Sequence, residues 1–152
     1  MKTITKILSL MLVLTLSISM MACSSYGKVE KALAELGYAV VEGDEADKQF
    51  SDYEDMESVT DVHVLSKTVD VGLVDIPFYV VVLEFKSTDE LVEAYKESSN
   101  TFQGIIEDIN ENEDAKELYN QLQENGFVCG NCMILAISLD LDVYEKIAEL
   151  NK

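Results

Sequence analysis

Residues 76–98 read Ile76-Pro-Phe-Tyr-Val-Val-Val-Leu-Glu-Phe-Lys86 and then Ser87-Thr-Asp-Glu-Leu-Val-Glu-Ala-Tyr-Lys-Glu-Ser98. The first half is an almost unbroken run of β-branched and aromatic residues, which is typical of a strand covered on both faces. The second half changes to helical spacing, and Ser87 with Glu90 forms a capping box at the junction. This stretch therefore predicts a central strand that leads directly into a helix.

Apolar periodicity and turn residues divide the remaining chain into further helices and strands. The expected helices cover 28–36, 102–109 and 115–122, and a last one follows Asp140 or Asp142. The expected strands cover 38–41, 59–71 and the two sides of Gly130-Asn131, which is a two-residue hairpin signal. The pattern predicts an α+β domain of two layers, in which a mainly antiparallel sheet carries the helices on one face.

One local pattern occurs twice. A helix followed by glycine, an aromatic residue and a strand is expected at Gly37-Tyr38 and again at Gly126-Phe127. Glycine is the residue that most readily ends a helix, because it adopts positive φ at little steric cost. The repetition hints at duplication of a half-domain, although two independent uses of the same helix ending explain it nearly as well.

The first 22 residues have the layout of a secretory signal. Lys2 and Lys6 give a positively charged start, and residues 7–21 form an apolar run broken only by Ser and Thr. The run is shorter than the roughly 20 apolar residues that a comfortable transmembrane helix needs. We therefore exclude this segment from the fold.

The end of the segment, Met20-Met21-Ala22-Cys23, resembles the lipobox of bacterial lipoproteins. The resemblance implies cleavage before Cys23, attachment of diacylglycerol to the Cys23 sulfur and acylation of the new amino group, for example by palmitate. Two or more such chains anchor a protein lastingly, at about 0.8 kcal/mol per buried methylene. The implied location is the outer, extracytoplasmic face of the cell membrane. In size and acidity the chain resembles the small lipoproteins of Gram-positive bacteria.

On this interpretation the chain has three parts. Residues 1–22 are the signal peptide, 23–27 are the lipidated Cys23 with a short polar tether, and 28–152 are a single α+β domain. A mature chain of about 130 residues buries roughly two thirds of its unfolded surface, which is enough for a core without stabilising cross-links.

The charge of the chain excludes several classes of partner. Removal of Lys2 and Lys6 from the 11 lysines leaves nine against 29 acidic residues, a formal charge of −20, and the chain contains no arginine. Such a surface repels phosphate backbones and anionic lipid head groups, and it lacks the guanidinium fork that recognises phosphate. We therefore expect neither nucleic acid nor nucleotide as a partner. The acidic stretch 42–57 would instead suit a basic extracellular protein.

Cys129-Gly-Asn-Cys132 is the sharpest motif of the exported domain. On a hairpin the two cysteines face each other with Cα atoms at roughly 5.5 Å, so they form a structural disulfide or two packed thiols. The string Cys-Gly-Asn-Cys-Met-Ile-Leu also resembles the active site of thioredoxin-like oxidoreductases, which implies Cys129 as nucleophile and Cys132 as resolving thiol. We prefer the structural interpretation because Gly130-Asn131 suits a hairpin.

The other polar residues form no complete constellation. Residues 108–114 begin like a calcium loop, but Glu113 replaces the glycine of the turn and Tyr119 replaces the bidentate glutamate. His63 is the only histidine, and one histidine cannot build a typical zinc site or a catalytic base without a nucleophile. We therefore expect no metal and no cofactor. The leading hypothesis is a non-enzymatic binding or interaction module; the alternatives are a thiol-disulfide enzyme and an inhibitor of an extracellular enzyme.

Overall fold

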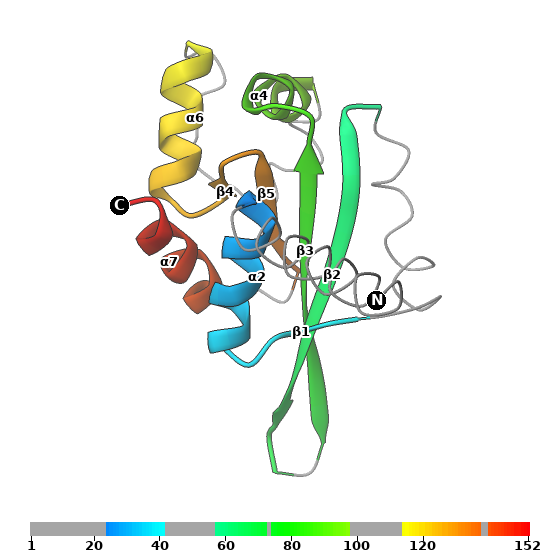
Figure 1. Cartoon of the computed structure of the whole chain (residues 1–152). Coiled ribbons are helices and arrows are strands. Elements are labelled where there is room, and N and C mark those ends of the chain that lie inside the picture. The colour runs from blue at the N-terminus through cyan, green and yellow to red at the C-terminus, as the bar shows by residue number, and fades with distance from the viewer. Residues whose placement is uncertain (1–23, 42–56, 73, 98–113, 138–139) are drawn as a thin grey trace, which may run out of the picture.

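The computed structural model describes residues 24–41, 57–72, 74–97, 114–137 and 140–152 (Figure 1). The helices are α2 (Ser25–Glu35), α4 (Thr88–Glu97), α6 (Ala115–Glu124) and α7 (Leu141–Leu150); the strands are β1 (Ala39–Val40), β2 (Val59–Asp70), β3 (Asp75–Phe85), β4 (Val128–Cys129) and β5 (Cys132–Ala136). The signal segment, Cys23, most of the acidic stretch, the expected helix over 102–109 and most of the calcium-like stretch lie outside the described residues. No helix within the described ranges is long and apolar enough to cross a membrane.

One antiparallel sheet contains all five strands, in the order β1-β2-β3-β5-β4. β3 lies at its centre, and the four residues from Val80 to Leu83 are fully buried. Because successive side chains of a strand point to opposite faces, burial of the whole run means that both faces of β3 are covered. The α+β class, the antiparallel sheet and the central strand are confirmed.

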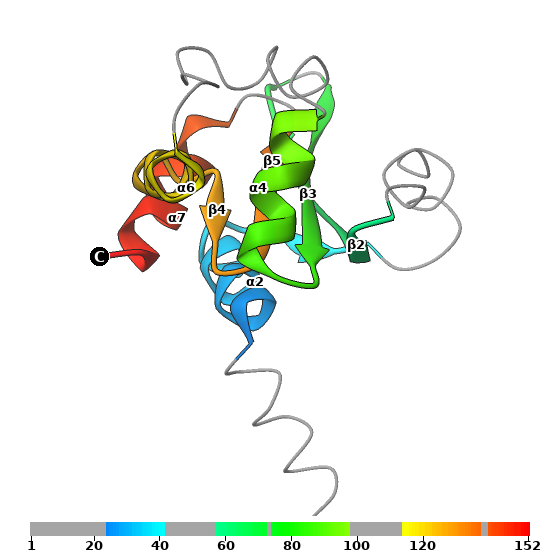
Figure 2. The ribbon, with the colours of Figure 1, turned by 90° about the horizontal axis from the view of Figure 1, so that it is seen from above.

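The helices lie on both faces of the sheet, so the prediction of two layers with helices on one face is wrong. α2 and α7 pack on the face that carries Val80 and Val82, and they lie beside each other (Figures 1 and 2). α4 and α6 pack on the face that carries Val81 and Leu83. Each helix has one apolar stripe to bury, and the unbroken apolar run of β3 offers a surface on either side. The result is a domain of three layers.

The two helices α2 and α6 end in the same way, as predicted. Gly37 and Gly126 have φ of +87° and +77°. The next N–H groups, of Tyr38 and Phe127, donate to carbonyl oxygens five residues back at 3.0 and 2.9 Å, which is the Schellman motif. A side chain at Gly126 would collide with the carbonyl oxygen of Tyr144, so the end of α6 lies directly against α7.

The domain begins earlier than predicted, because most of the expected tether is helical. Ser24 caps α2 by accepting a hydrogen bond from the Gly27 N–H at 3.0 Å, and the helix starts at Ser25. This first turn also packs on the β4–β5 hairpin, where a side chain at Gly130 would collide with that of Ser25. The polar composition of 24–27 suggested a tether, but the cap and the hairpin hold these residues in the fold.

Candidate functional site

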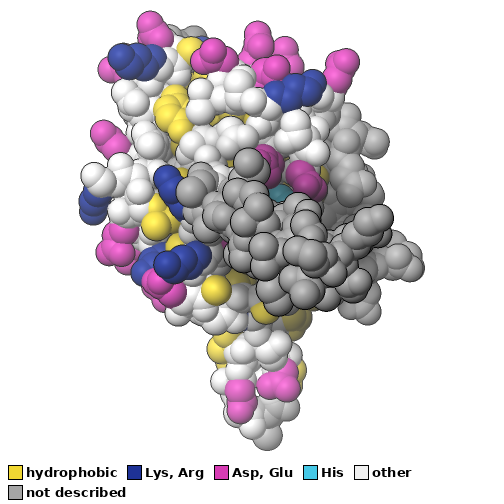
Figure 3. All heavy atoms as spheres, viewed as in Figure 1, with side chains coloured by type: hydrophobic (Ala, Val, Ile, Leu, Met, Phe, Trp, Pro, Cys, Tyr) yellow, Lys and Arg dark blue, Asp and Glu magenta, His cyan; other side chains and the backbone are white. Residues whose placement is uncertain are grey.

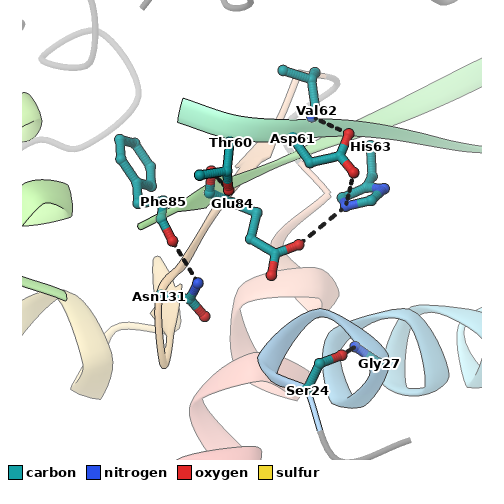
Figure 4. A network of polar contacts seen from close by, with 9 residues as sticks. All are labelled: Ser24, Gly27, Thr60, Asp61, Val62, His63, Glu84, Phe85 and Asn131. Carbon is teal, nitrogen blue, oxygen red and sulfur yellow. Dashed lines mark hydrogen bonds and ion pairs between the residues drawn. The ribbon is translucent and has the colours of Figure 1, made fainter. Parts of the chain in front are cut away.

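A row of ionisable side chains crosses the sheet near the first turn of α2, and Figure 4 shows Asp61, His63 and Glu84 of this row. Asp61 and His63 come from β2, Glu84 from β3, Cys132 from β5 and Cys129 from β4. Within the sheet, Asp61 is paired with Glu84, Glu84 with Cys132, and Cys132 with Cys129. Antiparallel pairs point to the same face, so pairing brings together residues that are far apart in the chain.

His63 joins two strands to helix α2. Its Nε2 lies 3.4 Å from Glu84 Oε2 and 3.8 Å from Asp61 Oδ2. The ring stacks on Tyr26 with centroids 3.5 Å apart and an interplanar angle of 13°. Burial, with the nearby charge of Glu30, raises the pKa of Tyr26, so its hydroxyl stays neutral. The environment is that of a partnered structural histidine. Among the described residues no group of three or more His, Cys, Asp or Glu side chains could hold a metal ion.

The two cysteines lie where the hairpin prediction put them. β4 and β5 are joined by Gly130 and Asn131, Gly130 has a φ of +58°, and Cys129 is paired with Cys132. Both are free, buried thiols in the structure. Burial raises the pKa of each thiol, and the charge of Glu84 adds to the effect at Cys132, whose pKa rises to about 12.

These surroundings are unlike those of a redox active site. A nucleophilic cysteine needs a depressed pKa and access for its partner, and burial denies both. The tip of the hairpin is also held from two sides: the Asn131 side-chain amide donates to the Phe85 carbonyl at 2.6 Å, and the Tyr119 hydroxyl donates to the Gly130 carbonyl at 2.8 Å. The geometry favours the structural interpretation of Cys129 and Cys132.

A groove beside α4 is strongly acidic. It has a volume of about 470 Å³ and is lined by Glu57, Glu90, Glu93 and Glu97, with Lys86 as the only basic lining residue. Glu57 is the last residue of the predicted acidic stretch, which therefore continues onto the surface of α4. The groove contributes to the negative field of this side of the domain, but an acidic cluster alone does not identify a ligand.

β2 and β3 extend beyond the other strands as a two-stranded ribbon, visible at the lower end of Figure 1. β1 pairs only with Leu65 and Ser66 of β2, and β5 pairs with β3 no further than Val80. We call residues 67–72 and 74–78 the arm. β2 and β3 pair with each other here as far as Asp70 and Asp75, but among the described residues neither strand is paired with a third along the arm.

Exposed apolar side chains gather on the arm and at its base. Val71, Val74 and Ile76 on the arm are 59%, 63% and 42% exposed. Three more exposed residues surround the base: Val40, Ile137 and Leu141. Six of the seven exposed large apolar side chains of the described residues therefore belong to this region. Apolar surface concentrated in this way marks an interaction site more often than scattered apolar residues do.

A charged contact fixes the base of the arm to α7. Lys67 Nζ lies 2.5 Å from Asp140 Oδ2, and the Tyr38 hydroxyl donates to the same oxygen at 2.8 Å. The Lys67 ammonium also lies 4.7 Å from the centre of the Tyr38 ring. Burial acts to raise the pKa of Asp140, but the hydrogen bonds and the charge of Lys67 outweigh it, and the net pKa is lowered. The arm therefore leaves the domain from a rigid base.

The sequence analysis missed the arm, although one signal pointed to it. The strands expected around Gly72 were long, and β2 and β3 are 12 and 11 residues. Ordinary strands have three to ten residues, and here the neighbouring strands have only two and five. Two long strands beside short ones must extend beyond their sheet.

Comparison with known proteins found no protein family, no curated protein and no solved structure that matches this chain. Its function therefore has to be argued from its own sites.

Proposed function

We propose that this chain is a non-enzymatic interaction module, anchored by lipid at Cys23 to the outer face of the cell membrane, that binds an extended, basic segment of an extracellular protein along the arm. The observation that carries the proposal is the exposed apolar surface on two strands that, within the described part of the chain, have no third strand beside them. An isolated two-stranded ribbon is only marginally stable in water, so a third strand would stabilise it.

Strand addition explains how the arm would bind. Free backbone N–H and C=O groups along a strand edge pair with an extended segment, and alternate side chains of that segment meet the apolar residues. Asp70 and Asp75 lie beside the exposed Val71 and Val74, so lysine or arginine in the segment would be attracted. The negative charge of the whole domain acts in the same direction.

The position of the arm suits a protein tethered at Cys23. The chain enters the domain at Ser24, beside the β4–β5 hairpin, and α2 leads from there to Tyr38 at the base of the arm. Eleven helical residues span about 16 Å. The arm therefore starts one helix length away from the proposed anchor, and a partner can reach it without meeting the lipid.

Two synthetic peptides test the proposal on the full chain purified from membranes in detergent. One alternates valine with lysine, and the other alternates valine with glutamate at the same spacing. We expect the lysine peptide to bind and to protect the arm amides from hydrogen exchange. Replacing Val74 and Ile76 by serine should weaken binding about tenfold or more, whereas the control Leu150→Ser should not.

Three results would overturn it: equal binding of the two peptides, unchanged binding by the arm variant, or a purified chain that dimerises through the arm. The last result would make a second copy of this chain the occupant.

A further inference from the structure

A groove between α2 and α7 gathers positive charge on this acidic chain. Its volume is about 380 Å³, and its lining includes three lysines: Lys28 and Lys31 from α2 and Lys146 from α7. Figure 3 shows lysine and apolar side chains together over these two helices. The lining contains one acidic residue, Glu35.

The groove keeps a net positive charge because its acidic residue is already neutralised. Lys146 Nζ lies 2.7 Å from Glu35 Oε2. The hydrogen bond and charge of each partner lower the pKa of Glu35 and raise that of Lys146, so both stay ionised. Lys28 and Lys31 are exposed and form no ion pair with any described residue. Two positive charges are therefore available to an anion.

The surface between the lysines is apolar. Ala32 lies on the groove, and Leu150 is 41% exposed at its edge. Lysine side chains add their methylene groups to such a surface while the ammonium group stays in water. The chemistry selects an anion that carries an apolar part, as a phospholipid head group does where it joins its acyl chains.

The groove also lies close to the point where the chain enters the domain. Lys28 and Lys31 follow Ser24, the cap of α2, by about one and two helical turns, or roughly 6 and 10 Å along the axis. These distances are comparable with the screening length of about 8 Å at physiological ionic strength. A membrane that holds Cys23 would therefore lie within electrostatic range of both lysines.

We infer that this groove binds the anionic head groups of the bilayer in which Cys23 is anchored and so turns the α2–α7 face of the domain towards the membrane. The inference rests on the proposed lipid anchor. The net charge of −20 led us to expect repulsion from anionic lipid, but this expectation does not hold for every face of the domain. The fold places three lysines in the α2–α7 groove and the glutamate-lined groove beside α4 in the other helix layer. Local charge, not net charge, decides which face approaches the bilayer.

Lysine reactivity in vesicles tests the inference. The full chain, purified from membranes, is placed in phosphatidylcholine vesicles with or without about 30% phosphatidylglycerol, and the acetylation rate of each lysine is measured by mass spectrometry. We expect phosphatidylglycerol to slow acetylation of Lys28 and Lys31 about fivefold and about 0.5 M salt to reverse the effect. Lys86 and Lys116, outside the groove, should react alike in both vesicles.

Matched charge variants complete the test. In Lys28→Glu/Lys31→Glu, any slowing at Lys146 by phosphatidylglycerol should disappear, whereas Lys86→Glu/Lys116→Glu should behave like the unmodified chain. Equal acetylation of Lys28 and Lys31 in the two kinds of vesicle would overturn the inference. So would equal protection by soluble glycerol 3-phosphate without vesicles, because the ligand would then be a free anion.

The mass of the peptide that begins at Cys23 separates this inference from the anchor. A lipidated peptide with no protection of the lysines would overturn the groove inference and leave the anchor standing. An unlipidated peptide with protection in phosphatidylglycerol vesicles would support the groove and overturn the anchor.

Discussion

At Gly130 the absence of a side chain lets the first turn of α2 pack directly on the β4–β5 hairpin. The glycine has positive φ, and its Cα lies so close to Ser25 that any Cβ would collide with the serine side chain. Gly72 also has positive φ, at +94°, but nothing lies within 4 Å of the Cβ it would carry. A substitution at Gly72 therefore introduces backbone strain alone, whereas one at Gly130 introduces both backbone strain and a steric collision.

Gly130→Ala should destabilise the domain more than Gly72→Ala. Backbone strain costs about 1 kcal/mol at either position. At Gly130 the collision with Ser25 should add about 1–2 kcal/mol, because the first turn of α2 has to move. Urea unfolding of both variants measures the difference. Equal losses would show that α2 does not rest on the hairpin as described.

The two buried thiols should be nearly inert in the folded protein. With a pKa of about 12, Cys132 has roughly a thousandfold less thiolate at pH 8 than an ordinary cysteine. After reduction, iodoacetamide should therefore alkylate Cys129 and Cys132 in urea and leave them almost unmodified in native buffer. Rapid alkylation of the native protein would restore the thiol-disulfide hypothesis.

Among the elements, the arm is held at its base by a charged contact outside itself. Lys67 at its base and Tyr38 after α2 both hold Asp140, the residue before α7. The Asp140 side chain is only 10% exposed, so solvent screens this ion pair less than it would a pair on the surface. Three elements from distant parts of the chain are joined at one carboxylate.

Asp140→Asn should lower the free energy of unfolding by about 2 kcal/mol at pH 7, because Lys67 loses its charged partner. The folded-state pKa of Asp140 is lowered, so its contribution is present above the unfolded pKa of about 3.9 and is lost as pH falls through the folded pKa. The difference between variant and unmodified protein should therefore shrink at acid pH. Asp142→Asn, in the exposed first turn of α7, is the control. A pH-independent difference would contradict the assignment.

At the scale of the whole molecule, a strongly negative chain is combined with a described core of aliphatic, aromatic and cysteine side chains. No buried polar or charged residue occurs within the described ranges. The charged side chains of these ranges are therefore all at least partly exposed, and on a chain with a formal charge of −18 like charges repel. Both helix layers share β3 and β5, so they should unfold together.

Salt should stabilise this molecule. Raising sodium chloride from about 0.05 to 0.5 M shortens the screening length and weakens repulsion, which should raise the free energy of unfolding by about 1 kcal/mol. Lys28→Glu/Lys31→Glu should show a larger gain, because it replaces two positive charges by two negative ones and makes the net charge four units more negative. Loss of stability with salt in both proteins would mean that ion pairs outweigh repulsion. Thermal unfolding of both proteins across the salt series shows whether charge repulsion or ion pairing dominates.

The sequence by itself determined the features that depend on near neighbours. The Ser87 half of the capping box is formed, since Glu90 N–H donates to Ser87 Oγ at 3.2 Å, and the glycine ends of α2 and α6 and the Gly130-Asn131 hairpin are where they were predicted. Each rests on backbone geometry within a few residues, so local composition suffices. The apolar run of β3 likewise required cover on both faces.

Only the tertiary structure decided which surfaces meet and which stay open. It placed helices on both faces, drew Ser25 into α2, left Val74 on a free arm and gathered Lys28 with Lys146 in one groove. These outcomes depend on contacts between residues far apart in the chain, and no local pattern encodes them. Both proposed binding surfaces belong to this second kind, because a surface exists only once the rest of the chain has packed.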